Sequence, residues 1–368
     1  MHHDLKGLDL FEEDILREGV LLTQVVADVR AGAEAIASAL PTPTHVYLVG
    51  CGDSYDASIA AGYVWSKLLR VPVEGVPAMT FATAMVDVAP EGALVVGLSV
   101  SGKVSRVVEA VRAATDRGFT TVTVTMNGES PFALEPSTAT WKLDFTKLGA
   151  IPGTTSHLIG GLALYELGCA LAGPSAERDQ LRAEIDGFGA LVTQAVADCV
   201  PVANKHAEAM ARDLPVLLIG YGPGMSAARF SVRKMLELTQ LVAFWQETEE
   251  YAHDEYSLVD KRFRVLQLAP PDRGSIRSRE IAHYLRRLDV HLSVVTDGDE
   301  ADRYDGLADI VYRLPACPPA LAPFLYVIPG QLLALATARQ LGGSLYGMAE
   351  QVHREDGDPQ IYESEIVT

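Results

Sequence analysis

The pattern of hydrophobic and polar positions in the first 170 or so residues alternates between two kinds of segment. Runs rich in apolar or β-branched residues, typical of buried strands, occupy residues 45–49, 71–73, 93–98 and 120–125. Segments with apolar residues three and four apart, typical of helices, cover residues 10–40, 55–69, 79–85, 104–117 and 157–171. Strands that alternate with helices predict an α/β fold, in which a parallel sheet is covered on both faces.

The same pattern returns in the second half of the chain. Strands are predicted at 214–220, 263–268, 292–296 and 310–312, and helices at 225–241 and 327–340. Two strands end in Gly-x-Gly turns, at Gly50 and Gly220, and an offset of about 170 residues indicates duplication, not a short-period solenoid. We therefore predict two similar, flavodoxin-like α/β/α halves.

These elements predict the domain organisation of the chain. An N-terminal helical segment covers 1–40, the first half 41–172, a helical linker 173–211, the second half 212–345 and a C-terminal tail 346–368. The tail is polar, and we expect it to be extended.

The charge of the chain restricts its partners. The formal net charge is −18 over 368 residues, and such an acidic surface repels nucleic acid and anionic membranes. The N-terminus lacks the basic and apolar regions of a signal peptide, and no apolar run approaches the roughly 20 residues that span a bilayer. We expect a cytoplasmic protein without a nucleic-acid or membrane partner, in which local features bind any anionic substrate.

Neither the cysteines nor the histidines have the spacing of a metal site. The four cysteines form no Cys-x-x-Cys pair and lie among apolar residues, which favours reduced thiols over disulfides. The histidines are scattered without ligand spacing. The sequence therefore predicts no metal and no cofactor.

Two turns in the first half are candidate anion-binding sites. Cys51-Gly-Asp-Ser54 and Ser99-Val-Ser-Gly-Lys103 each join the end of a strand to the start of a helix. Free N–H groups and the helix dipole favour an anion at such a turn, and the serines, with Ser101 among them, add hydroxyl donors. Each turn alone is more typical of a plain helix cap. Two such turns on adjacent strands favour a ligand, because ligands bind at the carboxyl ends of strands in open α/β sheets.

The second half carries different chemistry. Its counterpart of the serine turn is Leu268-Ala-Pro-Pro271, which offers fewer N–H groups and no hydroxyl. Glu237 lies on a helix with an apolar face and is either a solvated carboxylate or a partly buried one that moves a proton between adjacent carbons. His253, 16 residues later, is either a surface residue or an acid–base group for opening a sugar ring.

Several segments in this order resemble the double-domain branch of the sugar isomerase (SIS) family. That branch contains the isomerase half of glucosamine-6-phosphate synthase and the fructosamine-6-phosphate deglycases. The matching segments are 49–55, 98–102, 150–156, 234–237, 250–253 and 322–331. The resemblance runs from about Leu10 to Val352 and implies two SIS-type three-layer sandwiches with parallel sheets.

The resemblance implies a sugar-phosphate pocket on the first half. Ser54, Ser99 and Ser101 match positions that bind the phosphate. Thr154 or Thr155 matches a loop position near the sugar.

The resemblance implies that the second half supplies the catalytic groups. Glu237 matches the carboxylate that moves a proton between C1 and C2 of the open-chain sugar, and Lys234 belongs to the same motif as a substrate-binding residue. His253 matches the ring-opening histidine, which usually comes from a second subunit. The resemblance therefore implies a homodimer with a shared site.

The chain departs from the family pattern at positions that matter for the substrate. Asp53 stands where the family commonly has threonine, and a carboxylate repels a phosphate, so Asp53 is a candidate to bind a sugar hydroxyl or an ammonium group. Glu350 stands nearest to the C-terminal lysine of the synthase, with His353 and Arg354 as candidate substitutes. No lysine follows Lys261, so a Schiff base from the tail is not expected.

We predict an enzyme that acts by enolisation on a hexose 6-phosphate or an amino-sugar (fructosamine) 6-phosphate. It would be an aldose–ketose isomerase, or a deglycase or deaminase of the amino sugar. One alternative is a non-catalytic sugar-phosphate regulator, against which Glu237 and His253 argue; another is an isomerase of an unphosphorylated sugar. A nucleotide-binding Rossmann enzyme is disfavoured because the turn after Gly50 lacks the third glycine.

Overall fold

The structure is a computed structural model that describes residues 2–347, 361 and 363–366. The chain divides into two compact units. The first unit comprises Leu21–Lys147, Thr155–Gly187 and the described residues after 352. The second comprises the described residues up to Val20, then Leu148–Thr154 and 188–347. Two long helices, α1 (His2–Ser38) and α7 (Ala176–Ala207), contribute residues to both units.

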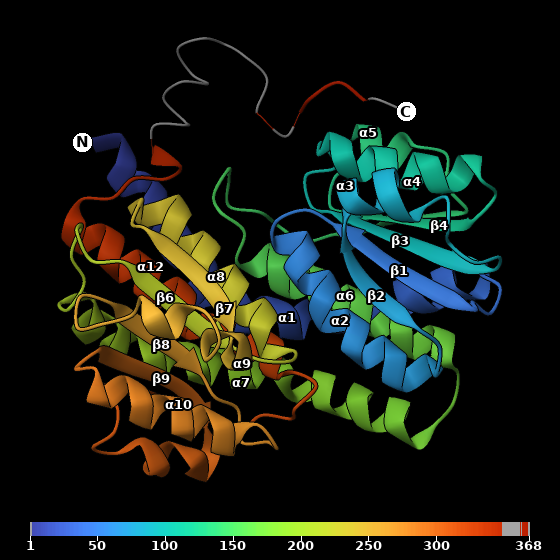
Figure 1. Ribbon diagram of the computed structural model, residues 1–368. Coiled ribbons are helices and arrows are strands. Elements are labelled where there is room, and N and C mark those ends of the chain that lie inside the picture. The colour runs from blue at the N-terminus through green and yellow to red at the C-terminus, as the bar shows by residue number, and fades with distance from the viewer. Residues whose placement is uncertain (1, 348–360, 362, 367–368) are drawn as a thin grey trace. The chain divides into compact units, whose positions relative to one another are not determined.

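The first unit is built on a five-stranded parallel sheet, in the order β2-β1-β3-β4-β5 (Figure 1). Its strands are β1 (His45–Gly50), β2 (Val73–Pro77), β3 (Ala93–Ser99), β4 (Thr120–Thr125) and β5 (Ala139–Lys142). Every residue of β3 is buried, as expected for a central strand with helices on both faces.

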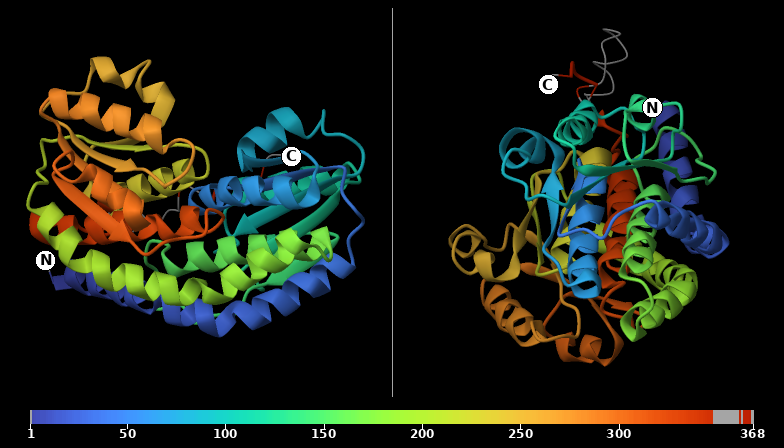
Figure 2. Two further views of the ribbon diagram at one scale, coloured as in Figure 1. Left: turned by 90° about the horizontal axis from the view of Figure 1, so that it is seen from below. Right: turned by 90° about the vertical axis from the view of Figure 1, so that its right-hand side faces the viewer.

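Helices cover both faces of this sheet (Figures 1 and 2). One face packs against α2 (Asp53–Leu69) and α6 (Thr155–Ala172). The other packs against α3 (Ala78–Thr80), η1 (Phe81–Met85) and α4 (Ser105–Asp116), with α5 (Pro131–Leu134) beyond α4.

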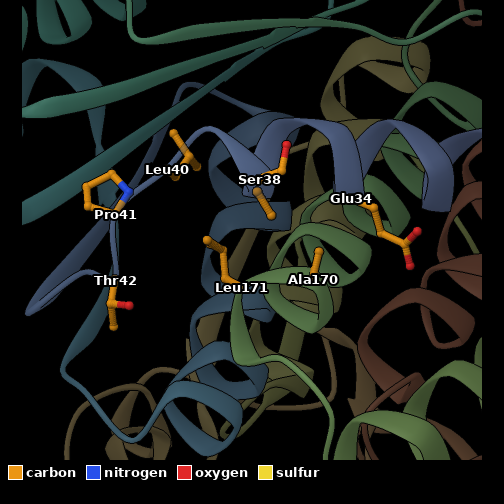
Figure 3. Close-up of a pocket in the computed structure, with 8 residues that line it drawn as sticks. Glu34, Ser38, Leu40, Pro41, Thr42, Ala170 and Leu171 are labelled. Atoms are coloured by element: carbon orange, nitrogen blue, oxygen red, sulfur yellow. The ribbon is translucent and has the colours of Figure 1, made fainter.

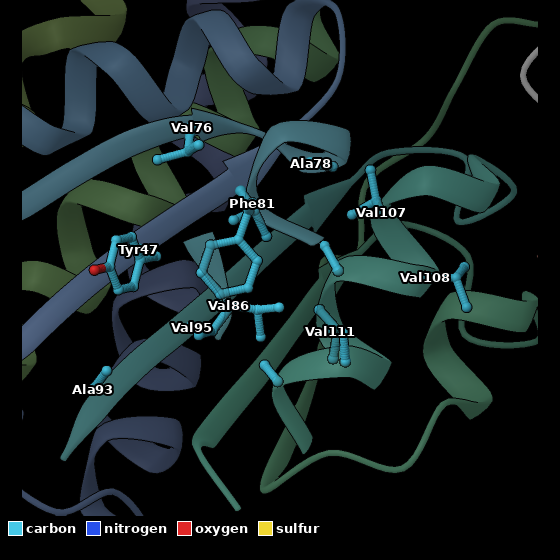
Figure 4. Packing of buried hydrophobic residues seen from close by; sticks show 14 of the residues in the cluster. Tyr47, Val76, Ala78, Phe81, Val86, Ala93, Val95, Val107, Val108 and Val111 are labelled. Atoms are coloured by element: carbon cyan, nitrogen blue, oxygen red, sulfur yellow. The ribbon is translucent and has the colours of Figure 1, made fainter. Parts of the chain in front are cut away.

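The core on the α4 face is formed by large apolar side chains from the sheet and its covering helices. The rings of Tyr47 and Phe81 pack in a tilted arrangement with their centroids 5.1 Å apart, and Val95 and Val111 lie beside them (Figure 4). Burying each such side chain stabilises the fold by about 1.5–3 kcal/mol.

A tryptophan joins the two helices on the opposite face. The indole N–H of Trp65, on α2, donates to the carbonyl of Leu164, on α6, at 2.7 Å. The two helices approach this closely because Gly168 has no side chain; a Cβ there would lie 2.5 Å from the indole nitrogen. Trp141, on β5, is also buried in this unit.

The second unit contains a second five-stranded parallel sheet, in the order β10-β9-β8-β6-β7. Its strands are β6 (Val216–Gly220), β7 (Ala243–Glu247), β8 (Arg264–Leu268), β9 (His291–Asp297) and β10 (Ile310–Leu314). Its other elements are α8 (Gly224–Thr239), α9 (Thr248–Tyr251), η2 (Glu255–Ser257), α10 (Ser275–Arg287), η3 (Gly298–Tyr304), α11 (Ala322–Leu325) and α12 (Val327–Leu341). Trp245, on β7, lies under the guanidinium of Arg229, 4.5 Å from the ring centroid.

The predicted fold class is confirmed. Read from β6, the second sheet has the strand order of the first, which the duplication predicts. The edge strands β5 and β7 were missed from the sequence, and the strand expected at 71–73 is β2, Val73–Pro77. The predicted domain boundaries stay a prediction, because α1 and α7 each belong to both units.

Contrary to the expectation from the sequence, one helix is long and apolar enough by composition to cross a membrane. This helix is α7. Its apolar side chains pack inside the protein at positions such as Phe188, Val192 and Cys199, each at most 3% exposed. A core helix passes the same test, so α7 gives no reason to propose a membrane partner.

A buried histidine stabilises the second unit. His206, near the end of α7, is hydrogen-bonded through Nδ1 to the hydroxyl of Tyr312 and through Nε2 to that of Ser293, both at 3.0 Å. Burial, with a smaller contribution from the neighbouring His291, lowers the pKa of His206 to about 3. The ring is therefore neutral in the folded protein at neutral pH.

This histidine predicts a loss of stability in acid. Between its ordinary pKa of about 6.5 and the folded value of about 3, the unfolded chain binds a proton that the folded chain does not. The free energy of unfolding should therefore fall as the pH drops through this window, by about 1.4 kcal/mol per pH unit from this group. Urea unfolding at several pH values should show a flatter slope for His206→Gln. An unchanged slope would contradict the assignment.

Candidate functional site

Two serine-containing turns lie side by side at one edge of the first sheet. β1 and β3 are adjacent and parallel, with Val49 opposite Gly97, so their carboxyl ends meet at the same edge. The first turn leads through Gly52, which has a φ of +58°, into Asp53 and α2. The second leads from Ser99 into α4. The structure thus brings together the two turns that the sequence predicted, at the edge where α/β sheets bind ligands.

The side chain of Ser99 gives the strongest indication of a bound ligand at this end of the sheet. Its side chain is 2% exposed, and its hydroxyl has no hydrogen-bond partner among the described residues. Leaving a buried hydroxyl unsatisfied costs about 1–3 kcal/mol. Such a group in a folded protein calls for an explanation, and a bound anion that accepts from the hydroxyl provides one.

The carbonyl groups of the second turn are hydrogen-bonded to the neighbouring segment that follows β4. Those of Val100, Ser101 and Gly102 accept from the segment after β4: from Met126 N at 3.3 Å, the side-chain amide of Asn127 at 3.4 Å and Phe132 N at 3.1 Å. Because the N–H and C=O of a peptide point in opposite directions, these contacts turn the N–H of Ser101 to the other side of the loop.

Gly102 is required for this packing. It has a φ of +68°, and a Cβ at this position would lie 1.9 Å from the hydroxyl oxygen of Ser130. A larger residue would force the serine turn away from the β4–α5 segment. Neither Ser130 nor Asn127 was singled out from the sequence, because both act through the turn and not at its surface.

Of the remaining predicted residues of this unit, Ser54, Asp53 and Ser101 belong to the turns themselves, and Thr155 lies at the start of α6. Ser54 is buried in the first turn of α2. The hydroxyl of Ser101 accepts from Lys103 N at 3.3 Å. Asp53 begins α2, where the helix dipole favours its carboxylate, and its carbonyl lies 3.1 Å from Nδ1 of His157. Thr155 is buried as the first residue of α6.

The second unit holds the carboxylate predicted to be catalytic. Nζ of Lys234 donates to Oε2 of Glu237 at 2.7 Å, one turn along α8. The lysine side chain is fully buried and lies 4.7 Å from the ring centroid of Phe230, whereas the side chain of Glu237 is 27% exposed. The ammonium group therefore holds the carboxylate in one orientation while leaving it accessible to solvent.

The positions of His253 and Thr154 give less support to the roles predicted for them. The imidazole of His253 is 67% exposed, and its Nε2 lies 3.6 Å from the carboxylate of Glu249. The hydroxyl of Thr154 is buried and donates to Asp14, on α1, in the second unit. Thr154 therefore has a structural partner, and the imidazole of His253 is paired with an exposed carboxylate at the surface of its unit.

The predicted site residues fall into two groups, one in each unit. Ser54, Asp53, Ser99, Ser101 and Thr155 belong to the first unit. Glu237, Lys234, His253 and Thr154 belong to the second. Glu350, His353 and Arg354, the candidates for the family's C-terminal lysine, lie outside the described residues.

A C-terminal segment that the sequence did not connect with the site contacts the second turn. The carbonyl of Ser364 accepts from the hydroxyl of Ser105 at 2.5 Å, and the carboxylate of Glu363 lies 3.4 Å from Nζ of Lys103. The two partners are about 260 residues apart, so no local pattern could have indicated the contact.

Metal binding has no support among the residues that the structure describes. They contain no cluster of three His, Cys, Asp or Glu side chains that could hold an ion. None of the four cysteines is in a disulfide, and Cys169 and Cys199 are buried.

A cavity of about 290 Å³ in the first unit lies away from the two turns (Figure 3). It lies where α1 ends and β1 begins, beside the last turn of α6, at the opposite edge of the sheet. Its charged lining residue is Glu34, which is paired with Arg182 at 2.9 Å. The cavity offers no further charge for recognising a substrate.

Residues 40–140, which contain both turns, match the family model of the SIS domain. The chain therefore contains a SIS domain in its first unit. It is 27% identical to glutamine–fructose-6-phosphate aminotransferase (isomerizing) of Mycobacterium leprae over 307 residues, which are 81% of this chain and 48% of that protein. The chain thus spans about half the length of the curated relatives it matches.

Solved structures of SIS-domain proteins share the fold over nearly the whole chain. The C-terminal domain of glucosamine-fructose-6-phosphate aminotransferase from Francisella tularensis superimposes with a TM-score of 0.83 and 20% identity, covering 92% of this chain and 97% of that one. Tagatose-6-phosphate ketose/aldose isomerase from Escherichia coli gives a TM-score of 0.75 and 19% identity, covering 90% and 93%. The shared fold therefore includes the second unit, and its two five-stranded parallel sheets are consistent with two SIS halves.

Proposed function

We propose that this SIS-domain protein is a phosphosugar isomerase. Its substrate would be a hexose 6-phosphate or an amino-sugar (fructosamine) 6-phosphate, converted by enolisation in an aldose–ketose isomerisation or in a deglycation or deamination. The observation that carries the proposal is the buried, unpartnered hydroxyl of Ser99 at the meeting point of two helix-opening turns. The names of the similar proteins, an isomerizing aminotransferase and a ketose/aldose isomerase, support this class of substrate.

In this proposal the first unit binds the phosphate. The hydroxyls of Ser54, Ser99 and Ser101 and the N–H groups that open α2 and α4 donate to the phosphate oxygens. Asp53 does not contact the phosphate; its carboxylate accepts a hydrogen bond from a hydroxyl or an amine of the sugar.

Glu237 acts as the base that moves a proton between C1 and C2 of the open-chain sugar: it takes the proton from C2 of an aldose or from C1 of a ketose and returns it to the other carbon. The buried Lys234 positions its carboxylate. His253 assists ring opening, and its exposure in its own unit is compatible with a site completed by a second copy of the chain. We propose accordingly a cytoplasmic homodimer.

A non-catalytic sugar-phosphate sensor is the second candidate. The imidazole of His253, which is exposed and lies beside the exposed carboxylate of Glu249, favours it. The two functions differ in one assay: a sensor binds 6-phosphates but does not interconvert aldose and ketose forms, which coupled enzymatic or NMR detection of the product measures directly.

Substitution of Ser99 by alanine should separate ligand binding from stability. Without ligand, Ser99→Ala should melt at the same or a higher temperature, because the change removes an unsatisfied buried hydroxyl that costs about 1–3 kcal/mol. With a 6-phosphate substrate the wild type should gain about 2.7 kcal/mol at 100 times Kd by mass action, and the variant much less. A thermal-shift screen of hexose, amino-hexose and fructosamine 6-phosphates, each with its unphosphorylated form, measures both effects.

Ser137→Ala provides the matched control, since Ser137 lies in the same unit before β5, away from the two turns. It should retain the full ligand-induced shift. Stabilisation of the wild type by unphosphorylated sugars alone, or by none of the compounds, would rule out a phosphosugar substrate.

A further inference from the structure

The start of α4 presents a binding surface made of basic and hydroxyl side chains. Lys103, Ser105 and Arg106 lie within four residues of one another directly after the serine turn. Arg106 is also paired with Glu109 at 2.7 Å, whereas the side chain of Lys103 is 54% exposed. In a chain with a net charge of −18, such a surface attracts acidic groups.

The chain's own C-terminal residues occupy this surface. Ser105 donates to the carbonyl of Ser364 at 2.5 Å, and Arg106 donates to the hydroxyl of Ser364 at 3.1 Å and to the carbonyl of Glu365. Glu363 places its carboxylate 3.4 Å from Nζ of Lys103.

Apolar packing extends the same contact. Ile366 is partly buried against the core cluster of the first unit, to which Met85 and Val104 also belong. Polar contacts from three consecutive residues, 363–365, followed by an apolar contact from Ile366, form a continuous interface and not a single chance contact.

The occupied groups are those that an anion at the serine turn would use. Lys103 ends the Ser99–Lys103 turn, and the hydroxyl of Ser105 lies on the first residue of α4, where the helix dipole favours negative charge. The carboxylate of Glu363 pairs with the ammonium group of Lys103, and the carbonyl of Ser364 accepts the hydrogen bond of the Ser105 hydroxyl. Glu363 and Glu365 also add two negative charges near a site that must attract an anion.

We propose that residues 363–366 are an internal acidic ligand of the α4 surface and compete there with the phosphate group of the substrate. The docking of the segment stands on its own contacts; the competition rests on the proposed function. Bound phosphate would accept hydrogen bonds from Lys103 and Ser105 in place of residues 363–366 and so release them. Conversely, the docked segment would lower the affinity of the protein for phosphate.

Cleavage by a glutamate-specific protease tests the docking. The bonds after Glu363 and Glu365 are cut only when the segment leaves the surface, and mass spectrometry distinguishes them from cuts after other glutamates. In the full-length protein, Arg106→Ala should raise the rate of both cuts several-fold. Arg117→Ala, which removes an arginine at the far end of the same helix, should not. Equal rates in the wild type and in Arg106→Ala would overturn the docking.

Inorganic phosphate tests the competition in the same assay. Phosphate should raise the cleavage rate of the wild type until the rate reaches a plateau. Sodium chloride at matched ionic strength should not raise it. Cleavage of a free peptide under the same conditions corrects for effects of phosphate on the protease. Glu363→Gln should bind phosphate about two- to fivefold more tightly, the range for an exposed ion pair. If Arg106→Ala releases the segment but phosphate leaves cleavage unchanged, the docking holds and the phosphate site at the serine turn fails. Weaker phosphate binding by Glu363→Gln would overturn the competition.

Discussion

Replacement of Glu237 by glutamine is expected to abolish most turnover while sugar-phosphate binding survives. Glutamine keeps the shape of the side chain and an oxygen for Nζ of Lys234, which lies 2.7 Å from the carboxylate in the wild type. It cannot take up a proton, and loss of a general acid–base group typically costs about 10²- to 10⁴-fold in rate. The proposed phosphate-binding serines lie in the other unit and are untouched.

Steady-state kinetics with the substrate found by the thermal-shift screen, together with the ligand-induced shift itself, measure the two effects separately. Glu280→Gln, a change of an exposed glutamate in the same unit, is the control and should leave both unchanged. Loss of binding and turnover together in Glu237→Gln, with a lowered melting temperature, would show that Glu237 is structural. Glu237→Asp keeps a carboxylate beside Lys234 on a shorter side chain. It tests whether turnover depends on the position of the carboxylate as well as on its charge.

Removal of the carboxylate of Glu166 should destabilise the first unit more than any surface change. Glu166, on α6, is fully buried and accepts from Arg30 at 2.9 and 2.8 Å and from Arg182 at 3.1 Å. It therefore joins α6 to α1 and α7. Glu166→Ala leaves two partly buried guanidinium groups without this counter-charge, and breaking such a pair costs about 3–5 kcal/mol.

Urea denaturation of the wild type and the variant measures this loss as a shift of the midpoint. Both arginines retain some exposure, 25% and 15%, and Arg30 also pairs with Asp186, so the lower end of the range is expected. Glu177→Ala is the matched control, because its exposed carboxylate lies 3.8 Å from Arg70 and should contribute less than about 1 kcal/mol. A loss no larger than that of the control would contradict a central role for this ion pair.

The central strands were predictable because their residues are apolar on both faces. β3 has no exposed position, and its continuous apolar run leaves little alternative. The edge strand β7 is different: all five of its residues are partly exposed, and its sequence ends in glutamine and glutamate. β5 is only four residues long and alternates between buried and exposed positions. Neither has a pattern that sequence alone distinguishes from a loop.

The candidate site was predictable in part for a similar reason. Ser54 and Ser99 follow strands directly, so the rule that ligands bind at strand ends placed them at one edge. The partners of Thr154 and Ser105 were not predictable, because Asp14 and Ser364 lie about 140 and 260 residues away in the chain. Contacts over such separations depend on the whole fold and leave no local signal.

The distribution of tryptophans gives the protein its own optical probes. The chain has three: Trp65 and Trp141 are buried in the first unit, and Trp245 stacks with Arg229 in the second. Changing Trp245 to phenylalanine would leave an emission spectrum that reports on the first unit alone. Changing Trp65 and Trp141 would leave the indole of Trp245. Its emission is sensitive to the neighbouring guanidinium of Arg229 and reports on the second unit. Unfolding of the two halves of a duplicated fold can thus be followed separately, by tryptophan fluorescence, in two variants of the whole chain.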